Sequence, residues 1–235
     1  VHFRRSLPEH HSSFGALYGN WALTAQILGD LERAERLQRQ ALTIKRRLKH
    51  NQVEIGLTLT NLGNLLVERG RPAEALPHLQ EALAIQRDAF GERHLYVAAA
   101  EINLGLGLLA TGDAPAADRR FATGERIFRD LYGDDSTPVA VALTRRAQAA
   151  RAGGDLAGAA DLLRESVAMH RRQLPNGRRR LGQALLHQAD LASAREDRAL
   201  ARAAAREAAD ILTDVLGADH ADTRRAHELA AAARH

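Results

Sequence analysis

The sequence predicts an all-α protein: a right-handed superhelical α-solenoid of about five helix pairs, followed by a C-terminal capping helix. Three observations support this fold class. A turn motif recurs about every 42 residues, three columns of small residues recur with it, and apolar residues follow the 3.6-residue period of a helix. Repetition at such a period is typical of arrays in which each helix pair packs on its neighbours.

The clearest copy of the unit covers residues 54–97. Its apolar stripe predicts a first helix over about residues 55–69. Gly70 suits the end of this helix, because glycine adopts a left-handed backbone without a Cβ penalty. Pro72 suits the first turn of a second helix, where its missing N–H would be unpaired in any case. The unit is therefore expected to be two helices joined by a tight turn.

The turn recurs at steps of 41, 42, 42 and 42 residues. It is found at Gly29–Asp30, Gly70–Arg71, Gly112–Asp113, Gly154–Asp155 and, without its glycine, Glu196–Asp197. Aspartate after the turn is a good N-cap, since its carboxylate accepts free N–H groups. Alignment on the turn predicts five units, at residues 12–52, 53–96, 97–138, 139–180 and 181–222. Residues 1–11 are interpreted as the tail of a truncated preceding repeat, and residues 223–235 as the capping helix.

Three columns of the aligned units contain only small residues, and a fourth contains long apolar ones. The small columns are Ala22, Gly63, Gly105, Ala147, Ala189; Ala34, Ala75, Ala117, Ala159, Ala201; and Ala41, Ala82, Gly124, Ser166, Ala208. The apolar column is Ile44, Ile85, Ile127, Met169, Ile211. Helices approach closely only where side chains are small, so the small columns are expected at buried helix crossings. Trp21, at an apolar position of the first unit, is expected in the core.

These positions resemble the tetratricopeptide repeat (TPR), in its longer kinesin-light-chain-like form of about 42 residues. The resemblance is carried by Asn61-Leu62-Gly63, Gly70, Glu74-Ala75, Ala82-Leu83 and the link from Gly91 to Val97. It covers nearly the whole chain and weakens in the last two units. There Arg146 and Gln188 replace the apolar residue of Leu62 and Leu104, and looser packing is expected. His94 and His220 share the link column, where a turn-stabilising hydrogen bond is expected.

The composition is that of an ordinary globular protein, with 26% charged and 45% apolar residues. Cysteine is absent, which excludes disulfides and thiolate metal sites and is compatible with a reducing cytoplasm. The sequence shows neither a membrane-spanning apolar run nor a signal-peptide pattern. Two lysines against 31 arginines indicate a high-G+C, bacterial genome. The formal charge of +4 is small and the arginines are scattered among acids, so nucleic-acid binding is not expected.

No catalytic, cofactor or metal pattern is found, so an enzyme is not expected. His227–Glu228 begins like a zinc-protease helix but lacks the second histidine. The pair Gly105 and Gly107 is expected to lie within a helix, where close packing explains it better than a phosphate loop.

One polar column is the candidate binding site. It contains Asn20, Asn61, Asn103, Arg145 and His187, and Asn64 shares the face of Asn61. In the family this face lines a concave groove, so the resemblance implies peptide binding there. Asparagine offers both a donor and an acceptor, and can pair with the backbone of an extended peptide. The alternative is that these asparagines bond to neighbouring helices or to the links between them.

The column becomes cationic toward the C-terminus, at Arg145, with Arg151 and Arg178–Arg180 expected nearby. Arginine pairs well with carboxylates, so an acidic partner segment is expected at that end. The leading hypothesis is a non-enzymatic module that binds a peptide or partner segment in its groove. The alternative is the sensor or autoinhibitory region of a larger bacterial signalling NTPase or transcriptional regulator.

Overall fold

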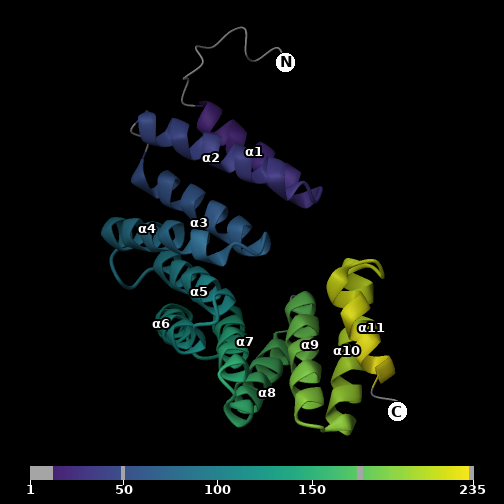
Figure 1. Ribbon diagram of the computed structural model, residues 1–235. Helices are drawn as coiled ribbons and strands as arrows, with labels where there is room; N and C mark the ends of the chain where they lie inside the picture. Colours follow the sequence, from purple (N-terminus) through teal and green to yellow (C-terminus); the bar gives the residue numbers. More distant parts are fainter. Residues whose placement is uncertain (1–12, 49–50, 174–176, 233–235) are drawn as a thin grey trace. The chain divides into compact units, whose positions relative to one another are not determined.

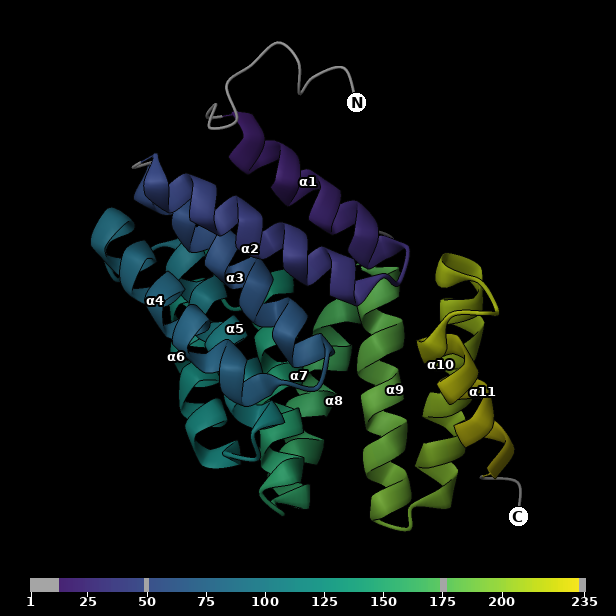
Figure 2. The same cartoon turned by 45° about the horizontal axis from the view of Figure 1, so that its top comes forward.

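The computed structural model describes residues 13–48, 51–173 and 177–232, and within these ranges the chain forms eleven α-helices and no strand (Figures 1 and 2). The helices are α1 (Ser13–Ile27), α2 (Leu31–Arg47), α3 (Gln52–Glu68), α4 (Pro72–Phe90), α5 (Leu95–Ala110), α6 (Ala114–Tyr132), α7 (Thr137–Ala152), α8 (Leu156–Arg172), α9 (Arg178–Ala194), α10 (Arg198–Leu216) and α11 (Ala221–Ala232). The all-α solenoid class is confirmed. In the described ranges no helix is long and apolar enough to cross a membrane.

The chain divides into two compact units between Asp113 and Ala114. The first contains α1 to α5 and the second contains α6 to α11. The predicted repeat borders differ from this division and stay a prediction. The helix α11 lies where a capping helix was expected. The predicted remnant at residues 1–11 lies outside the described residues.

The turns have the predicted geometry. Gly29, Gly70, Gly112 and Gly154 adopt positive φ angles between 71° and 89°, as a helix C-cap requires. Glu196 occupies the same position in the fifth turn with a φ of 60° and without a glycine. After three of these turns an aspartate accepts a backbone N–H of the next helix, namely Asp30, Asp155 and Asp197.

The links show a second kind of cap. His94 Nδ1 accepts a hydrogen bond from the N–H of Tyr96 at 3.2 Å, and His220 Nδ1 accepts one from the N–H of Asp222 at 3.1 Å. Both bonds close the first turn of a helix, so the structural role predicted for these two histidines is confirmed.

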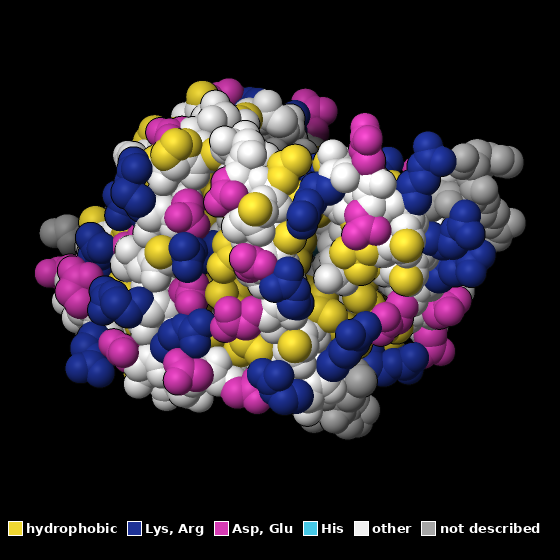
Figure 3. Space-filling model, turned by 90° about the horizontal axis from the view of Figure 1, so that it is seen from below, with side chains coloured by type: hydrophobic (Ala, Val, Ile, Leu, Met, Phe, Trp, Pro, Cys, Tyr) yellow, Lys and Arg dark blue, Asp and Glu magenta, His cyan; other side chains and the backbone are white. Residues whose placement is uncertain are grey.

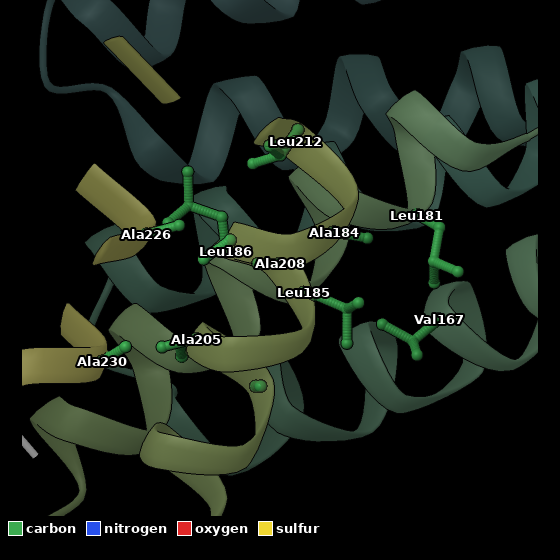
Figure 4. Close-up of a cluster of buried hydrophobic side chains, with 13 residues drawn as sticks. Val167, Leu181, Ala184, Leu185, Leu186, Ala205, Ala208, Leu212, Ala226 and Ala230 are labelled. Atoms are coloured by element: carbon green, nitrogen blue, oxygen red, sulfur yellow. The ribbon is translucent and has the colours of Figure 1, made fainter. Parts of the chain in front are cut away.

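The predicted helix crossings are buried. Ala75, Ala117 and Ala159 are inaccessible to solvent, and the other members of the small columns are buried as well. A Cβ atom added to Gly63 would lie 2.6 Å from Leu79, and one added to Gly182 would lie 2.8 Å from Leu212. In the second unit, side chains of α8 to α11 enclose an alanine- and leucine-rich core, in which Leu185, Ala208 and Ala226 lie (Figure 4).

The prediction that Trp21 belongs to the core is wrong. Its exposed fraction is 49%, and its ring contacts Tyr18 edge-on, with ring centres 5.7 Å apart. The aligned Leu62 and Leu104 are buried, and the aligned Arg146 bonds to α6, the second helix of the preceding pair. A side chain at this aligned position therefore packs against the preceding helix pair. Trp21 lies on α1, which no described helix precedes.

Several buried carboxylates hold neighbouring helices together. Glu35 of α2 is 2% exposed and pairs with Arg39, Arg69 and Arg71. In the second unit, buried Glu125 accepts hydrogen bonds from Arg129 at 2.8 Å and from Arg146 at 3.1 Å.

The same bonds give Arg146 a packing role. It also donates to Asp118 at 2.9 Å, so α6 and α7 are joined by ion pairs at the position where Leu62 and Leu104 make apolar contacts. These ion pairs occupy the place where looser packing was expected.

Candidate functional site

In the first unit the predicted residues lie on α1, α3 and α5. Asn20 and Asn61 are exposed, whereas Asn64 and Asn103 are half-buried. Asn64 Nδ2 donates to Asn103 Oδ1 at 3.2 Å, which joins α3 to α5. The alternative role, bonding between neighbouring helices, therefore applies to this pair. Asn61 is four residues beyond the exposed Leu57, so both side chains lie on the same face of α3.

In the second unit the two remaining predicted residues, Arg145 and His187, line one cavity of about 480 Å³. Its walls come from α7, α8, α9 and the beginning of α11. The polar lining consists of Thr144, Arg145, Gln148, His170, Arg180, Gln183, His187 and Asp222. The aligned face of the first helices α7 and α9 thus borders a polar cavity.

A chain of hydrogen bonds crosses this space from α7 to α9. Arg145 Nη1 donates to Gln148 Oε1 at 3.1 Å, and Gln148 Nε2 lies 2.5 Å from His187 Nε2. Because the arginine holds the amide oxygen, the amide nitrogen faces the imidazole and donates to it. The accepting imidazole is then neutral. Burial and the nearby guanidinium of Arg145 agree with this, since they lower the pKa of His187 to about 4.

The same pair of helices carries two arginines without a carboxylate partner among the described residues. Arg145 bonds only to Gln148, and burial lowers its pKa. Arg180, in the first turn of α9, lines the cavity as an exposed guanidinium. The carboxylate of the lining, Asp222, accepts a hydrogen bond from Gln183 at 3.0 Å. The lining therefore carries an excess of positive charge.

His170, near the end of α8, also lines the cavity. His170 is 1% exposed, and its buried Nδ1 has no hydrogen-bond partner among the described residues. Burial, together with the charge of Arg180, lowers the pKa of His170 to about 4. An imidazole that lines a cavity together with two guanidinium groups responds to the charge of a ligand bound there.

Sequence reasoning missed His170, although a signal for it exists. In three of the five sequence repeats, the residue directly after the long apolar column is polar and buried. These residues are Lys45, Gln86 and His170. The same core position is apolar in another repeat, at Leu212, so a polar residue there indicates a local polar environment within the core. Of the arginines expected nearby, Arg180 lines the cavity, and the charge of Arg151 acts on His187, whereas Arg178 pairs with Asp214.

On the face drawn in Figure 3, basic and acidic side chains alternate. Among the described residues, no group of three or more histidine, aspartate or glutamate side chains is placed to hold a metal ion. The site is therefore defined by hydrogen-bonding and positively charged groups.

An all-α array of helix pairs is the architecture of a repeat-type interaction scaffold. The tetratricopeptide repeat model matches the chain at residues 13–88, 54–130 and 96–172, with starting points 41 and 42 residues apart. These matches cover more than half of the sequence, and the chain belongs to the tetratricopeptide repeat family. The spacing of the matches agrees with the predicted repeat period.

Solved structures with this fold include BtubC (BKLC) from P. vanneervenii, 23% identical, with a TM-score of 0.70 over 87% of this chain and 83% of that one. A putative kinesin light chain with nearly identical TPR-like repeats from Podosopora anserina is 18% identical, with a TM-score of 0.68 over 88% and 98%. A Rap protein complexed with Competence and Sporulation Factor is 12% identical, with a TM-score of 0.67 over 94% and 65%. The search of curated proteins found no match.

Proposed function

We propose that this chain is a non-enzymatic interaction module that binds an extended segment of a partner protein on the polar face of its first helices. At the α7–α9 cavity the bound segment is acidic. The observation that carries the proposal is the pair Arg145 and Arg180, two cavity-lining guanidinium groups without a carboxylate partner in the described chain. A carboxylate supplied from outside would complete their hydrogen bonding.

The family and one structural neighbour support this proposal. Repeat arrays commonly use their extended surfaces for binding. The Rap protein similar in fold was crystallised with Competence and Sporulation Factor, so this architecture accommodates a bound partner in that protein. On composition, we also place the module in the bacterial cytoplasm, since cysteine is absent and arginine greatly exceeds lysine.

The charge preference is tested with fluorescently labelled peptides that are matched in length and differ only in Glu, Gln or Lys content. We expect the Glu peptides to bind most tightly, and Arg145→Glu to weaken them at least tenfold. The matched control is Arg164→Glu on α8, because Arg164 is exposed and pairs with Asp161 at 2.8 Å. Equal binding of the Glu and Lys peptides to the wild-type protein would refute the acidic assignment.

The backbone contacts of the first unit are tested separately on a peptide array. If the exposed asparagine face grips the peptide main chain, the double change Asn61→Ala and Asn103→Ala weakens every hit, whatever its sequence. Part of the effect could arise from losing the Asn64–Asn103 bond, so Asn64→Ala alone serves as the control for that bond. Hits that survive the double change unaltered would remove these asparagines from the site.

A further inference from the structure

The unsatisfied imidazole of His170 marks a place where the second unit is incomplete by itself. A buried polar atom without a partner is unfavourable by about 1–3 kcal/mol, so such atoms are rare in folded proteins. The cavity beside His170 measures about 480 Å³, which is ample room for a small ligand group. His170 lines this cavity together with Arg145 and Arg180, so an anion bound there lies near its ring.

The charges that face the two cavity histidines decide what kind of group this is. Arg145 and Arg151 act on His187 from α7, and Arg180 acts on His170 from α9. The opposing acids are Asp190 of α9 and Asp222 of α11. Both acids are already engaged, because Asp190 pairs with Arg225 at 2.9 Å and Asp222 bonds to Gln183.

We propose that this cavity binds one carboxylate of the partner segment, held by Arg145 and Arg180, and that the binding is accompanied by protonation of His170. The inference rests on the proposed function and adds to it a defined anchor and a dependence on pH. The bound carboxylate is an oxyanion, and a free anion such as inorganic phosphate presents the same chemistry.

The proton is taken up because an anion favours the charged form of a neighbouring imidazole. The neutral ring has one donor, whereas imidazolium has two and carries a charge that the anion balances. His187 is less suited to this role, since it accepts a hydrogen bond from Gln148 and would have to reverse that bond. Within the described part of the chain, Nδ1 of His170 has no such bond to break.

The direction of the pH effect follows from the unliganded state, in which the pKa of His170 is about 4. Binding raises this pKa, so affinity increases as the pH falls toward 4. If the bound pKa reaches about 6, affinity increases about tenfold between pH 7 and pH 5. Glutamate side chains, with an ordinary pKa of about 4.3, remain mostly ionised in this range.

The test uses the full chain labelled with ¹³C and ¹⁵N at histidine, and two probes: a capped Glu-containing peptide and inorganic phosphate. The pKa of His170 is measured by NMR with and without each probe, and peptide affinity is measured by calorimetry from pH 5 to pH 7. We expect the peptide to raise the pKa of His170 by at least one unit. His170→Gln should abolish the pH dependence of peptide affinity, and His78→Gln on α4 should change neither that dependence nor the pKa of His170.

The outcomes separate the two proposals. Tight peptide binding with an unchanged His170 pKa would overturn the proton-linked anchor and leave the proposed function standing. Failure of every Glu peptide to bind at any pH would overturn both. A pKa rise with phosphate but not with the peptide would assign the cavity to a free anion and reject the partner carboxylate. The NMR measurement on the wild-type chain decides the matter even where the His170→Gln variant folds poorly.

Discussion

At the scale of single residues, buried polar groups fall into two kinds. Glu35 and Glu125 are surrounded by arginines that complete their hydrogen bonding, so they act as fixed links between helices. His170 is as deeply buried as either, but its Nδ1 has no partner in the described ranges. The first kind is expected to contribute to stability, whereas the second is expected to reduce it.

Because His170 is buried, we expect the protein to lose stability in acid. Its pKa is about 4 when folded and about 6.5 in the unfolded chain, so the unfolded state binds more protons between these values. Stability is therefore complete above pH 6.5 and falls toward pH 4, by up to about 3 kcal/mol for this one group. Urea unfolding of His170→Leu should show a shallower decline over this range than the wild type. Parallel curves would mean that His170 does not titrate in this way.

Because Glu35 is buried among arginines, we expect the loss of its single carboxylate charge to lower the unfolding free energy strongly. Glu35→Gln leaves three guanidinium groups around an uncharged amide, and we expect a loss of about 3 kcal/mol in unfolding free energy. The control lies one turn away on the same helix, where Glu32 pairs with Arg36 at 3.7 Å and is 74% exposed. Glu32→Gln should change stability by less than about 0.5 kcal/mol. Similar values for the two variants, measured by guanidinium denaturation, would argue against the network around Glu35.

At the scale of helices and turns, the fifth turn shows that the geometry survives without its usual residue. Glu196 adopts a φ of 60°, in the region that glycine occupies in the other four turns. The left-handed backbone is unfavourable by about 1 kcal/mol for a residue with a Cβ atom. The packing of α9 against α10 is therefore sufficient to impose the turn.

Glycine at this position should relieve the strain. We expect Glu196→Gly to raise the unfolding free energy by about 1 kcal/mol, because the native conformation is one that glycine adopts readily. Glu196→Ala removes the same side chain but keeps the Cβ atom, and should give no such gain. A thermal melt of the two variants side by side makes the comparison, and equal midpoints would contradict it.

The turns and crossings were predictable from the sequence because each depends on local chemistry. The positions of Gly29 and Gly154 follow from backbone sterics, and the buried state of Ala117 follows from its small size in every copy. Trp21 was mispredicted because its burial depends on a neighbouring pair, which its own residue type does not reveal. The cavity was only half predictable: Arg145 and His187 share a column, whereas His170 joins them from another helix.

At the scale of the whole molecule, each helix pair should respond to damage mainly in its own neighbourhood, as expected for a repeat array. Gly63→Val places methyl groups where a Cβ atom alone would lie 2.6 Å from Leu79. We expect a loss of about 2–3 kcal/mol from overpacking. Hydrogen exchange should show this loss in α3 and α4, while protection in α9 to α11 is unchanged.

The matched control for that experiment is Gly19→Ala on α1. A Cβ atom at Gly19 meets no atom within 4 Å, so the substitution should instead stabilise the helix, by about 0.5–1 kcal/mol. A uniform loss of protection across both units after Gly63→Val would show that the array unfolds as one cooperative body.

The amide of Gln148 helps to keep His187 uncharged. Its oxygen accepts a hydrogen bond from Arg145, so its nitrogen faces His187 and donates to the ring. Replacing that single nitrogen by oxygen, as in Gln148→Glu, would turn a donor into an acceptor of nearly the same shape. His187 would then hold its proton at much higher pH, visible in its NMR titration, and an isosteric exchange of one atom would reset the ionisation of a residue on another helix.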